Sequence, residues 1–326
     1  MMDHPTKSQQ LNFASPEVDQ KLVTISKSDD EKLLDLSALV FLLRINAITV
    51  SCNGWDFSKY LNCFFQLYMV STSAALFISN FYLLKQGNLN WWIVASSVWF
   101  LHSTLIYVLV SRAMSKKCSL LNILKVIVDT SPEELLQTKS VDSLSIKALT
   151  KWGAVIVTTL SLLNIILIAL NYDSVVHLFA VYTREAYYLS FVGQIPTSYI
   201  GSFCYFLHLP FIMVPCHILT LKIKTLLAYI EETLPETITS DDMLQCCQWF
   251  DTLNRKNNVV NDAIKPLVAT TFCTFGLLEI FLILSLYSEI EIPDISGMVI
   301  WIVLSGCILI FVAKYVGELE AQTGRY

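Results

Sequence analysis

Five histidines are the residues best suited to metal binding or acid–base catalysis, and their spacing favours neither. They are His4, His102, His177, His208 and His217. Only His208 and His217 fall in one expected helix, and their separation of nine residues does not match the i, i+4 spacing of a helical metal pair. The sequence contains no H-E-x-x-H, G-x-S-x-G or G-x-x-x-x-G-K-S/T motif. We therefore expect no catalytic residues and no bound metal or cofactor.

The nine cysteines are scattered and also fail to form a metal-binding pattern. Most lie inside apolar stretches, where a thiol behaves as a small hydrophobic side chain. These are Cys63, Cys204, Cys216, Cys273 and Cys307. Because no C-x-x-C pair with a second half is present, a zinc site is not indicated.

A carboxylate inside an apolar stretch is a candidate functional group, because burying a charge in a membrane is costly. Glu279 is the one such residue in the expected membrane spans. It either lines a ligand cavity or ion route, or pairs with a polar neighbour and only tunes packing. A single carboxylate is little for a proton-coupled transporter, which usually uses relays of ionisable residues.

Aromatic and amide residues in the outer halves of the expected spans suggest a small-molecule site. Part of this pattern is the aromatic belt of any membrane protein, which explains Trp91 and Tyr187 without a ligand. Residues expected to lie deeper fit an apolar, aromatic-lined pocket with a few polar anchors. The candidate ligand-binding residues are Trp92, Trp99, Asn164, Tyr188, Tyr199, Glu279 and Trp301.

The composition explains which elements must position these residues. Of 326 residues, 54% are hydrophobic and 15% charged, whereas soluble domains have about 25% charged residues. Six nearly uncharged stretches are long enough to cross the ~30 Å hydrocarbon core of a bilayer. A water-soluble enzyme and a disordered chain are excluded, and the net charge of −5 argues against a nucleic-acid binder. We predict an all-α polytopic membrane helix bundle.

The six predicted spans follow a polar tail and one further apolar stretch. The spans are 60–84, 86–111, 152–172, 197–221, 266–288 and 295–313. The tail is 1–32, and the stretch 33–55 holds Arg44 near its middle, which predicts an amphipathic or re-entrant helix at the cytoplasmic interface. We expect prolines 196, 210 and 215 to break the apolar run that ends in the fourth span.

The basic residues predict the orientation of this bundle. With a cytoplasmic N-terminus, the inner segments 1–59, 112–151, 222–265 and 314–326 hold 6, 7, 5 and 2 basic residues, 20 of the 22 in the chain. Only Lys85 and Arg184 fall outside. Because basic residues concentrate on the cytoplasmic side, both termini are expected there, in a multi-pass protein of the plasma membrane. The polar N-terminus has no apolar stretch typical of a cleaved signal peptide. One long outer loop is expected at 173–196.

Several spans are predicted to continue into the cytoplasm as helices. Apolar residues at helical spacing continue span two through Leu120 and Leu124, and span four through Ile230 to a stop near Pro235. Residues 60–235 thus hold spans one to four with their cytoplasmic extensions. Residues 239–326 hold a cytoplasmic helix, spans five and six, and the cytoplasmic C-terminal end. Residues 239–242 offer helix caps before an apolar stripe that leads into span five: Met243, Cys247, Phe250, Leu253, Asn257, Val260 and Ile264. We expect a cytoplasmic bundle that also binds neighbouring subunits.

Motifs spread along residues 34–326 carry a family resemblance. They are SALVFLLRI (37–45), LLNIL (120–124), the apolar run 203–224 with its basic extension, DTLN (251–254) followed by NNVVN (257–261) and LY (286–287), and ELEAQTGR (318–325). In this order the chain resembles the insect gustatory receptors, ligand-gated channels related to insect odorant receptors. The last motif is similar to the cytoplasmic turn after the family's sixth span.

The resemblance implies a chemoreceptor subunit that binds a small organic tastant from the extracellular side. It also implies a homo- or hetero-tetramer assembled through the cytoplasmic helices, forming a ligand-gated cation channel. Family members carry a seventh, pore-lining helix with a Thr-Tyr…Gln-Phe signature, whereas this sequence ends at Tyr326. The expectation is therefore a truncated or alternatively spliced product, an incorrect gene end, or a divergent member that works without its own pore.

Two other functions stay open. A six-span solute transporter is disfavoured because spans one to three and four to six show no repeat. A non-conducting modulatory subunit is the second alternative. In each case the expected partners are membrane lipid and small molecules or other subunits, and no nucleic acid.

Overall fold

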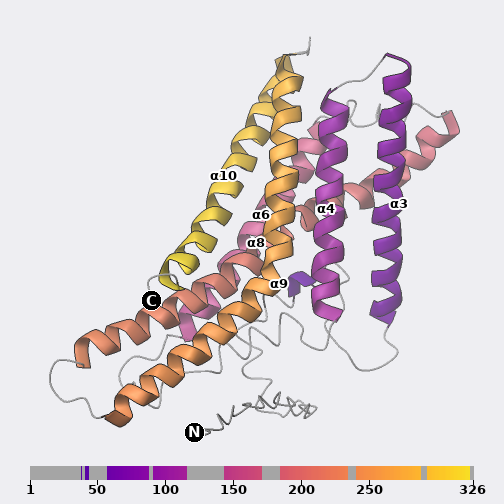
Figure 1. The fold of residues 1–326 in the computed structure, drawn as a ribbon. Helices are drawn as coiled ribbons and strands as arrows, with labels where there is room; N and C mark the ends of the chain where they lie inside the picture. Colours follow the sequence, from indigo (N-terminus) through magenta and orange to yellow (C-terminus); the bar gives the residue numbers. More distant parts are fainter. Residues whose placement is uncertain are drawn as a thin grey trace, which may run out of the picture.

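The computed structural model is helical throughout the residues that it describes, which are 38, 41–43, 57–87, 91–115, 143–170, 184–233, 240–287 and 292–323. Six long helices make up the bundle (Figure 1): α3 (Phe57–Lys85), α4 (Trp91–Ser115), α6 (Ser143–Leu170), α8 (Arg184–Thr233), α9 (Ser240–Leu286) and α10 (Ile292–Thr323). Within these residues the predicted all-α class is confirmed.

Five of the described helices are long and apolar enough to cross a membrane. These stretches are Tyr60–Lys85, Val94–Ala113, Gly201–Ala228, Cys246–Leu286 and Met298–Ala321. The third predicted span falls in α6, whose described apolar stretch, Ala148–Leu163, is shorter than a membrane span. The structure thus supports a multi-pass membrane protein with five candidate spans among the described residues, one fewer than the sequence predicts.

Several predicted elements lie outside the described residues. These are the tail 1–32, Arg44 and most of the stretch 33–55, and the cytoplasmic continuation of span two. From 33–55 the structure describes Ala38 and three residues, 41–43, all helical. Leu42 and Leu43 are fully buried in the core, while Phe41 is exposed.

A turn at Gln86 and Gly87 follows α3 and corrects the predicted start of the second span. The prediction was 86–111, but Gln86 and Gly87 form a turn, and α4 begins at Trp91. Gly87 has a φ of 73°, the left-handed conformation that commonly ends helices. The amide of Gln86 donates to the carbonyl of Tyr82 at 3.2 Å, and that of Gly87 to Leu84 at 3.1 Å. Glycine, without a side chain, allows this helix end.

Helix α8 is longer and more continuous than predicted. It begins at Arg184, so residues 184–196 of the predicted outer loop 173–196 are helical. The helix also runs unbroken past prolines 196, 210 and 215, where a break was expected. Prolines are tolerated in membrane helices because neighbouring helices and local adjustments compensate for the lost backbone hydrogen bond. The predicted stop near Pro235 is close to the observed end at Thr233.

The helix predicted to be cytoplasmic and the predicted fifth span form one continuous helix, as the apolar stripe indicated. Helix α9 starts at Ser240, within the predicted cap. The stripe is buried at Leu253, Asn257, Val260 and Ile264, whereas Met243 and Cys247 near its start are exposed. Figure 1 shows α9 changing direction between its two halves, which we attribute to Pro266 inside the helix.

Helix α10 extends ten residues beyond the predicted sixth span, which was 295–313. It ends at Thr323, so Glu318 to Ala321 are helical and do not form the turn that the resemblance implied. Span five also ends slightly early, since α9 stops at Leu286 and Tyr287 is a turn residue.

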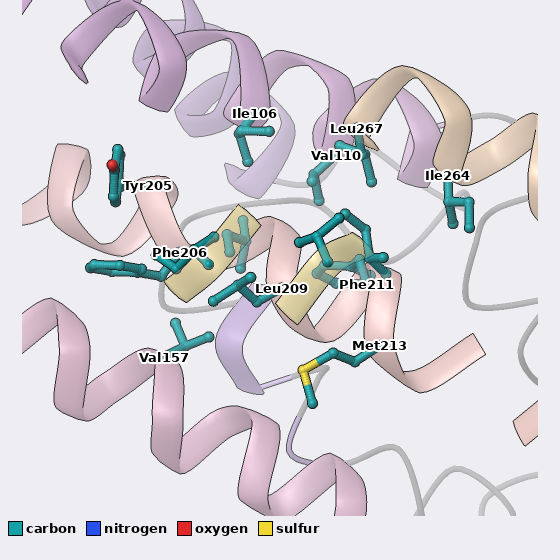
Figure 2. Close-up of a cluster of buried hydrophobic side chains, with 14 of the residues drawn as sticks. Ile106, Val110, Val157, Tyr205, Phe206, Leu209, Phe211, Met213, Ile264 and Leu267 are labelled. Carbon is teal, nitrogen blue, oxygen red and sulfur yellow. The ribbon is translucent and has the colours of Figure 1, made fainter. Parts of the chain in front are cut away.

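Helix α8 is the centre of the bundle. It contacts α4, α6, α9 and α10, and 89% of its apolar stretch is buried, against 22% for those of α3 and α10. Figure 2 shows Leu209 and Phe211 of α8 among Val157 of α6 and Leu267 of α9. The outer helices instead expose large apolar side chains, as a lipid-facing surface requires. Examples are Phe81 on α3, Trp152 on α6 and Ile310 on α10.

Polar side chains join α3 to α4 along their length. Asn62 Nδ2 donates to Ser111 Oγ at 2.7 Å, and Gln66 Nε2 donates to the same hydroxyl at 2.7 Å. Ser73 and Thr104 share a hydrogen bond of 2.8 Å, and Asn80 Nδ2 donates to Ser97 Oγ at 2.9 Å. Inside a bilayer, such interhelical hydrogen bonds are a recognised source of association energy. They hold α4, which contributes two site residues, in a fixed register with α3.

Candidate functional site

Four helices meet at a buried cluster of aromatic rings. Tyr205 of α8 is at its centre, stacked on Phe275 of α9 with ring centroids 5.0 Å apart. Trp301 of α10 meets the Tyr205 ring edge-on at 5.7 Å, and Trp99 of α4 lies 5.9 Å from it. Aromatic pairs in these geometries add stability beyond the area that they bury. The site is thus built on rigid helices and not on loops.

A glycine on α8 makes room for one of these rings. A Cβ atom built at Gly201 would lie 2.9 Å from Cη2 and 3.4 Å from Cζ3 of Trp99. Gly201 is one helical turn before Tyr205, so both residues present the same face of α8 to α4. The small residue therefore lets the Trp99 indole lie directly against the α8 backbone.

His102 of α4 links three helices below this aromatic layer. Its Nδ1 lies 2.6 Å from Thr274 Oγ1 of α9, and its Nε2 lies 3.3 Å from the carbonyl oxygen of Tyr205. A neutral imidazole has one N–H, so it donates in only one of these two contacts. The ring also packs edge-on against Phe275 at 4.8 Å.

His208 of α8 lies beside His102, with ring centroids 5.1 Å apart. It is one turn along α8 from Tyr205 and is fully buried. Neither of its ring nitrogens has a hydrogen-bond partner among the described residues. Two imidazoles that lie 106 residues apart in the chain are therefore neighbours in the bundle.

Unpaired polar atoms are concentrated at this junction. Trp99 Nε1 and the Tyr205 hydroxyl, like both nitrogens of His208, are buried without a partner in the described part of the chain. An unpaired buried polar group costs about 1–3 kcal/mol, so each needs an explanation such as water or a ligand. Together these side chains offer N–H and O–H donors and one imidazole acceptor. This arrangement can recognise a small polar molecule.

Glu279 of α9 lies next to the aromatic cluster. Its Oε1 accepts a hydrogen bond from Ser305 Oγ of α10 at 3.2 Å. The backbone at Gly306 is also close, because a Cβ there would be 3.4 Å from the same oxygen. Glu279 is half-buried. The predicted alternative of pairing with a polar neighbour is therefore observed, beside the predicted aromatic site.

The structure brings together the three predicted site residues whose side chains it describes. Trp99 of α4 and Trp301 of α10 both pack against Tyr205, and Glu279 of α9 bonds Ser305, one helical turn from Trp301. The side chains of the other four, which are Trp92, Asn164, Tyr188 and Tyr199, lie outside the described residues.

Four central residues were not among the predicted site residues. They are His102, Tyr205, His208 and Phe275. Sequence spacing relates histidines only along one helix, whereas a contact between α4 and α8 brings His102 and His208 together. A signal was present, because histidine in an apolar span is rare and is often functional.

Metal binding is not indicated among the described residues. They contain no group of three or more His, Cys, Asp or Glu side chains arranged to hold an ion. His102 and His208 form a pair without a third ligand, which is too few for a zinc site.

No protein-family model matches the chain, and a search of curated proteins finds no match to its sequence.

Proposed function

We propose that the chain is a gustatory-receptor-like chemoreceptor subunit of the plasma membrane. It binds a small organic tastant from the extracellular side and contributes to a ligand-gated cation channel. The order of the sequence motifs supports the family, and the four-helix junction supports the ligand site.

The observation that favours ligand binding is the set of unpaired polar atoms at the junction. Trp99 Nε1, the Tyr205 hydroxyl and both His208 nitrogens are buried among aromatic rings with no described partner. A protein core normally avoids this cost, while a binding site accepts it because the ligand supplies the missing hydrogen bonds. The mixture of donors and an imidazole acceptor fits a ligand with both hydroxyl or carbonyl oxygens and N–H or O–H groups.

The proposed topology has six spans, with α6 as the third and both termini in the cytoplasm. The distribution of basic residues, 20 on the inner side and 2 on the outer, supports this orientation. In Figure 1 the C-terminal end of α3 and the N-terminal end of α4 lie at the same end of the bundle as the C-terminal end of α9, as this topology requires. Glu279 and Trp301 then lie in the outer part of their spans, within reach of an extracellular ligand.

Assembly with other subunits is proposed to involve the first half of α9. Met243 and Leu244 are exposed there, at 48% and 59% of their full accessible area, as is Val259 further along. In the proposed topology this part of α9 is cytoplasmic, so lipid does not cover these side chains. A neighbouring subunit would bury them, which agrees with the tetramer that the resemblance implies.

Gating would follow from a difference in ligand affinity between two arrangements of the junction. The residues that meet the ligand lie on α4, α8, α9 and α10. Two of these helices, α8 and α9, extend far beyond the membrane stretch that holds the site. A shift at the junction would therefore move the proposed cytoplasmic assembly region, and through it a pore.

The test is a ligand-evoked current. Cells expressing the chain, alone and with a receptor subunit that has its own pore helix, would be exposed to a panel of sugars, alkaloids and amines. We expect a current in at least the co-expressing cells, reduced by His208→Ala. Surface expression of each variant is the control. Ligand-independent currents, or equal responses without this chain, would contradict the proposal.

A solute transporter is the second candidate, and one observation favours it. His102, His208 and Glu279 place three ionisable side chains in one region of the membrane-spanning bundle, and proton-coupled transporters use such groups. Uptake of a labelled solute without an evoked current would support this function. A current that appears only when a second subunit is present would instead support a modulatory subunit.

A further inference from the structure

Glu279 is a membrane-span carboxylate with an incomplete set of partners. Its one hydrogen bond among the described residues comes from Ser305, a neutral hydroxyl. No Lys or Arg of the described residues forms an ion pair with it. The side chain is half-buried, so it is neither fully solvated nor enclosed. A charge in this position usually has a partner of opposite sign.

An aromatic ring lies one helical turn from the hydrogen-bond partner of this carboxylate. Trp301 is one helical turn before Ser305, so both lie on the face of α10 that meets Glu279. The Trp301 and Tyr205 rings are nearly perpendicular, at 86°, with centroids 5.7 Å apart. In a perpendicular pair, one ring presents its edge and the other its face. The face of an aromatic ring attracts a cation through the quadrupole of the ring. The Tyr205 hydroxyl beside them has no described hydrogen-bond partner.

From this geometry we propose that the site takes an organic ammonium, with Glu279 as its counter-charge. The carboxylate would bind the ammonium head, and Trp301 and Tyr205 would contact its alkyl substituents and its charge. An inorganic cation fits less well, because the described residues contain no cluster of acidic or other metal-binding side chains here. The inference rests on the proposed ligand site and names the chemical class of its ligand.

Two ligands of the same shape separate recognition of the ligand's charge from burial of its apolar surface. Phenylethylamine carries an ammonium at neutral pH, and phenylethanol replaces it with a neutral hydroxyl. Binding of radiolabelled phenylethylamine to the purified full chain in lipid nanodiscs would be measured, with phenylethanol as a competitor. We expect the amine to bind roughly tenfold more tightly than the alcohol, because only the amine gains the ion pair.

Glu279→Gln removes the charge and keeps the shape and the Ser305 contact. It should weaken amine binding roughly tenfold and leave phenylethanol competition within about twofold. Trp301→Leu should weaken amine binding roughly fivefold through loss of the cation–π contact. Glu318→Gln is the matched control, since Glu318 is an exposed residue of the same helix α10. It should change neither affinity.

Several outcomes of these measurements would overturn the inference. Equal binding of both probes, no binding of the amine, or full amine affinity in Glu279→Gln each overturns the inference. If Glu279→Gln instead abolishes subunit association, Glu279 pairs with another subunit and the inference is wrong. If neutral compounds evoke currents that need His208 while Glu279→Gln has no effect, the proposed function stands without an ammonium ligand. If a variant has the size-exclusion elution volume and the unfolding midpoint of the wild type, its loss of affinity is not caused by misfolding.

Discussion

His102 Nδ1 on α4 and Thr274 Oγ1 on α9 lie 2.6 Å apart, 172 positions from each other in the sequence. This contact fixes the depth of α4 relative to α9 at the level of the proposed site. It also sets the plane of the His102 ring, which packs against Tyr205, His208 and Phe275. This polar contact between two helices therefore contributes, with the aromatic packing, to the geometry of the junction.

Thr274→Val should destabilise the bundle by about 1–3 kcal/mol, because it leaves a buried imidazole nitrogen without a partner. Unfolding of the purified chain in detergent measures this change. A double-mutant cycle with His102→Ala should give a coupling energy of about 0.5–3 kcal/mol. Thr252→Val is the matched control, since Thr252 Oγ1 bonds only to the carbonyl of Gln248 in its own helix, at an exposed site. Strict additivity of Thr274→Val and His102→Ala would show that the contact is not energetically important.

Gly201→Ala should displace the Trp99 indole, because the new methyl group would lie 2.9 Å from Cη2. Overpacking of this kind costs about 1–3 kcal/mol. Gly317→Ala, also in a helix, meets nothing within 4 Å. It should be neutral or stabilise by up to about 1 kcal/mol through helix propensity. Thermal unfolding of the two variants compares them directly. Equal thermal stability of Gly201→Ala and Gly317→Ala would contradict the close packing of Trp99 against Gly201.

Ser111→Ala should loosen α3 from α4, since the Ser111 hydroxyl bonds the side chains of both Asn62 and Gln66. Interhelical hydrogen bonds in membranes are worth about 0.6–2 kcal/mol, so a loss of that size is expected. Ser103→Ala is the control on the same helix, because Ser103 Oγ donates to the carbonyl of Trp99 within α4. Its effect should be smaller. A larger loss for Ser103→Ala would contradict the role given to Ser111.

New glycosylation sites test the proposed orientation. The chain has no N-x-S/T sequon, so each engineered site is read alone. Val181→Asn creates one in a segment proposed to be extracellular, and Thr138→Asn creates one in a segment proposed to be cytoplasmic. We expect a glycan on the Val181→Asn variant only, detected as a gel shift that an endoglycosidase removes. A glycan on the Thr138→Asn variant would show that this segment is extracellular and would contradict the proposed orientation.

The sequence predicts the helices well because apolar runs of membrane length have few alternative folds. It predicts helix ends poorly. The positive φ of Gly87, which ends α3, is a local choice that hydropathy does not report. The continuity of α8 past three prolines depends on packing of the central helix.

The site is predictable only in part, for a related reason. Trp99, Glu279 and Trp301 stand out in the sequence because large aromatic and charged side chains are unusual within spans. His102 and His208 become a pair only through the packing of α4 on α8, which no local spacing encodes. Tyr205 and Phe275 resemble ordinary core residues until their neighbours are known.

Tyr205→Phe tests the central proposal most directly, because folding and ligand binding should respond in opposite directions. The Tyr205 hydroxyl is buried with no partner among the described residues, so its removal should leave stability unchanged or raise it by about 1 kcal/mol. If a ligand bonds that hydroxyl, the same change should weaken the response to an agonist found in the current screen by roughly tenfold. The measurement is a dose–response curve for wild type and Tyr205→Phe at matched surface expression. A shifted curve with undiminished stability is the predicted result, and an unshifted curve would contradict a ligand site at this junction.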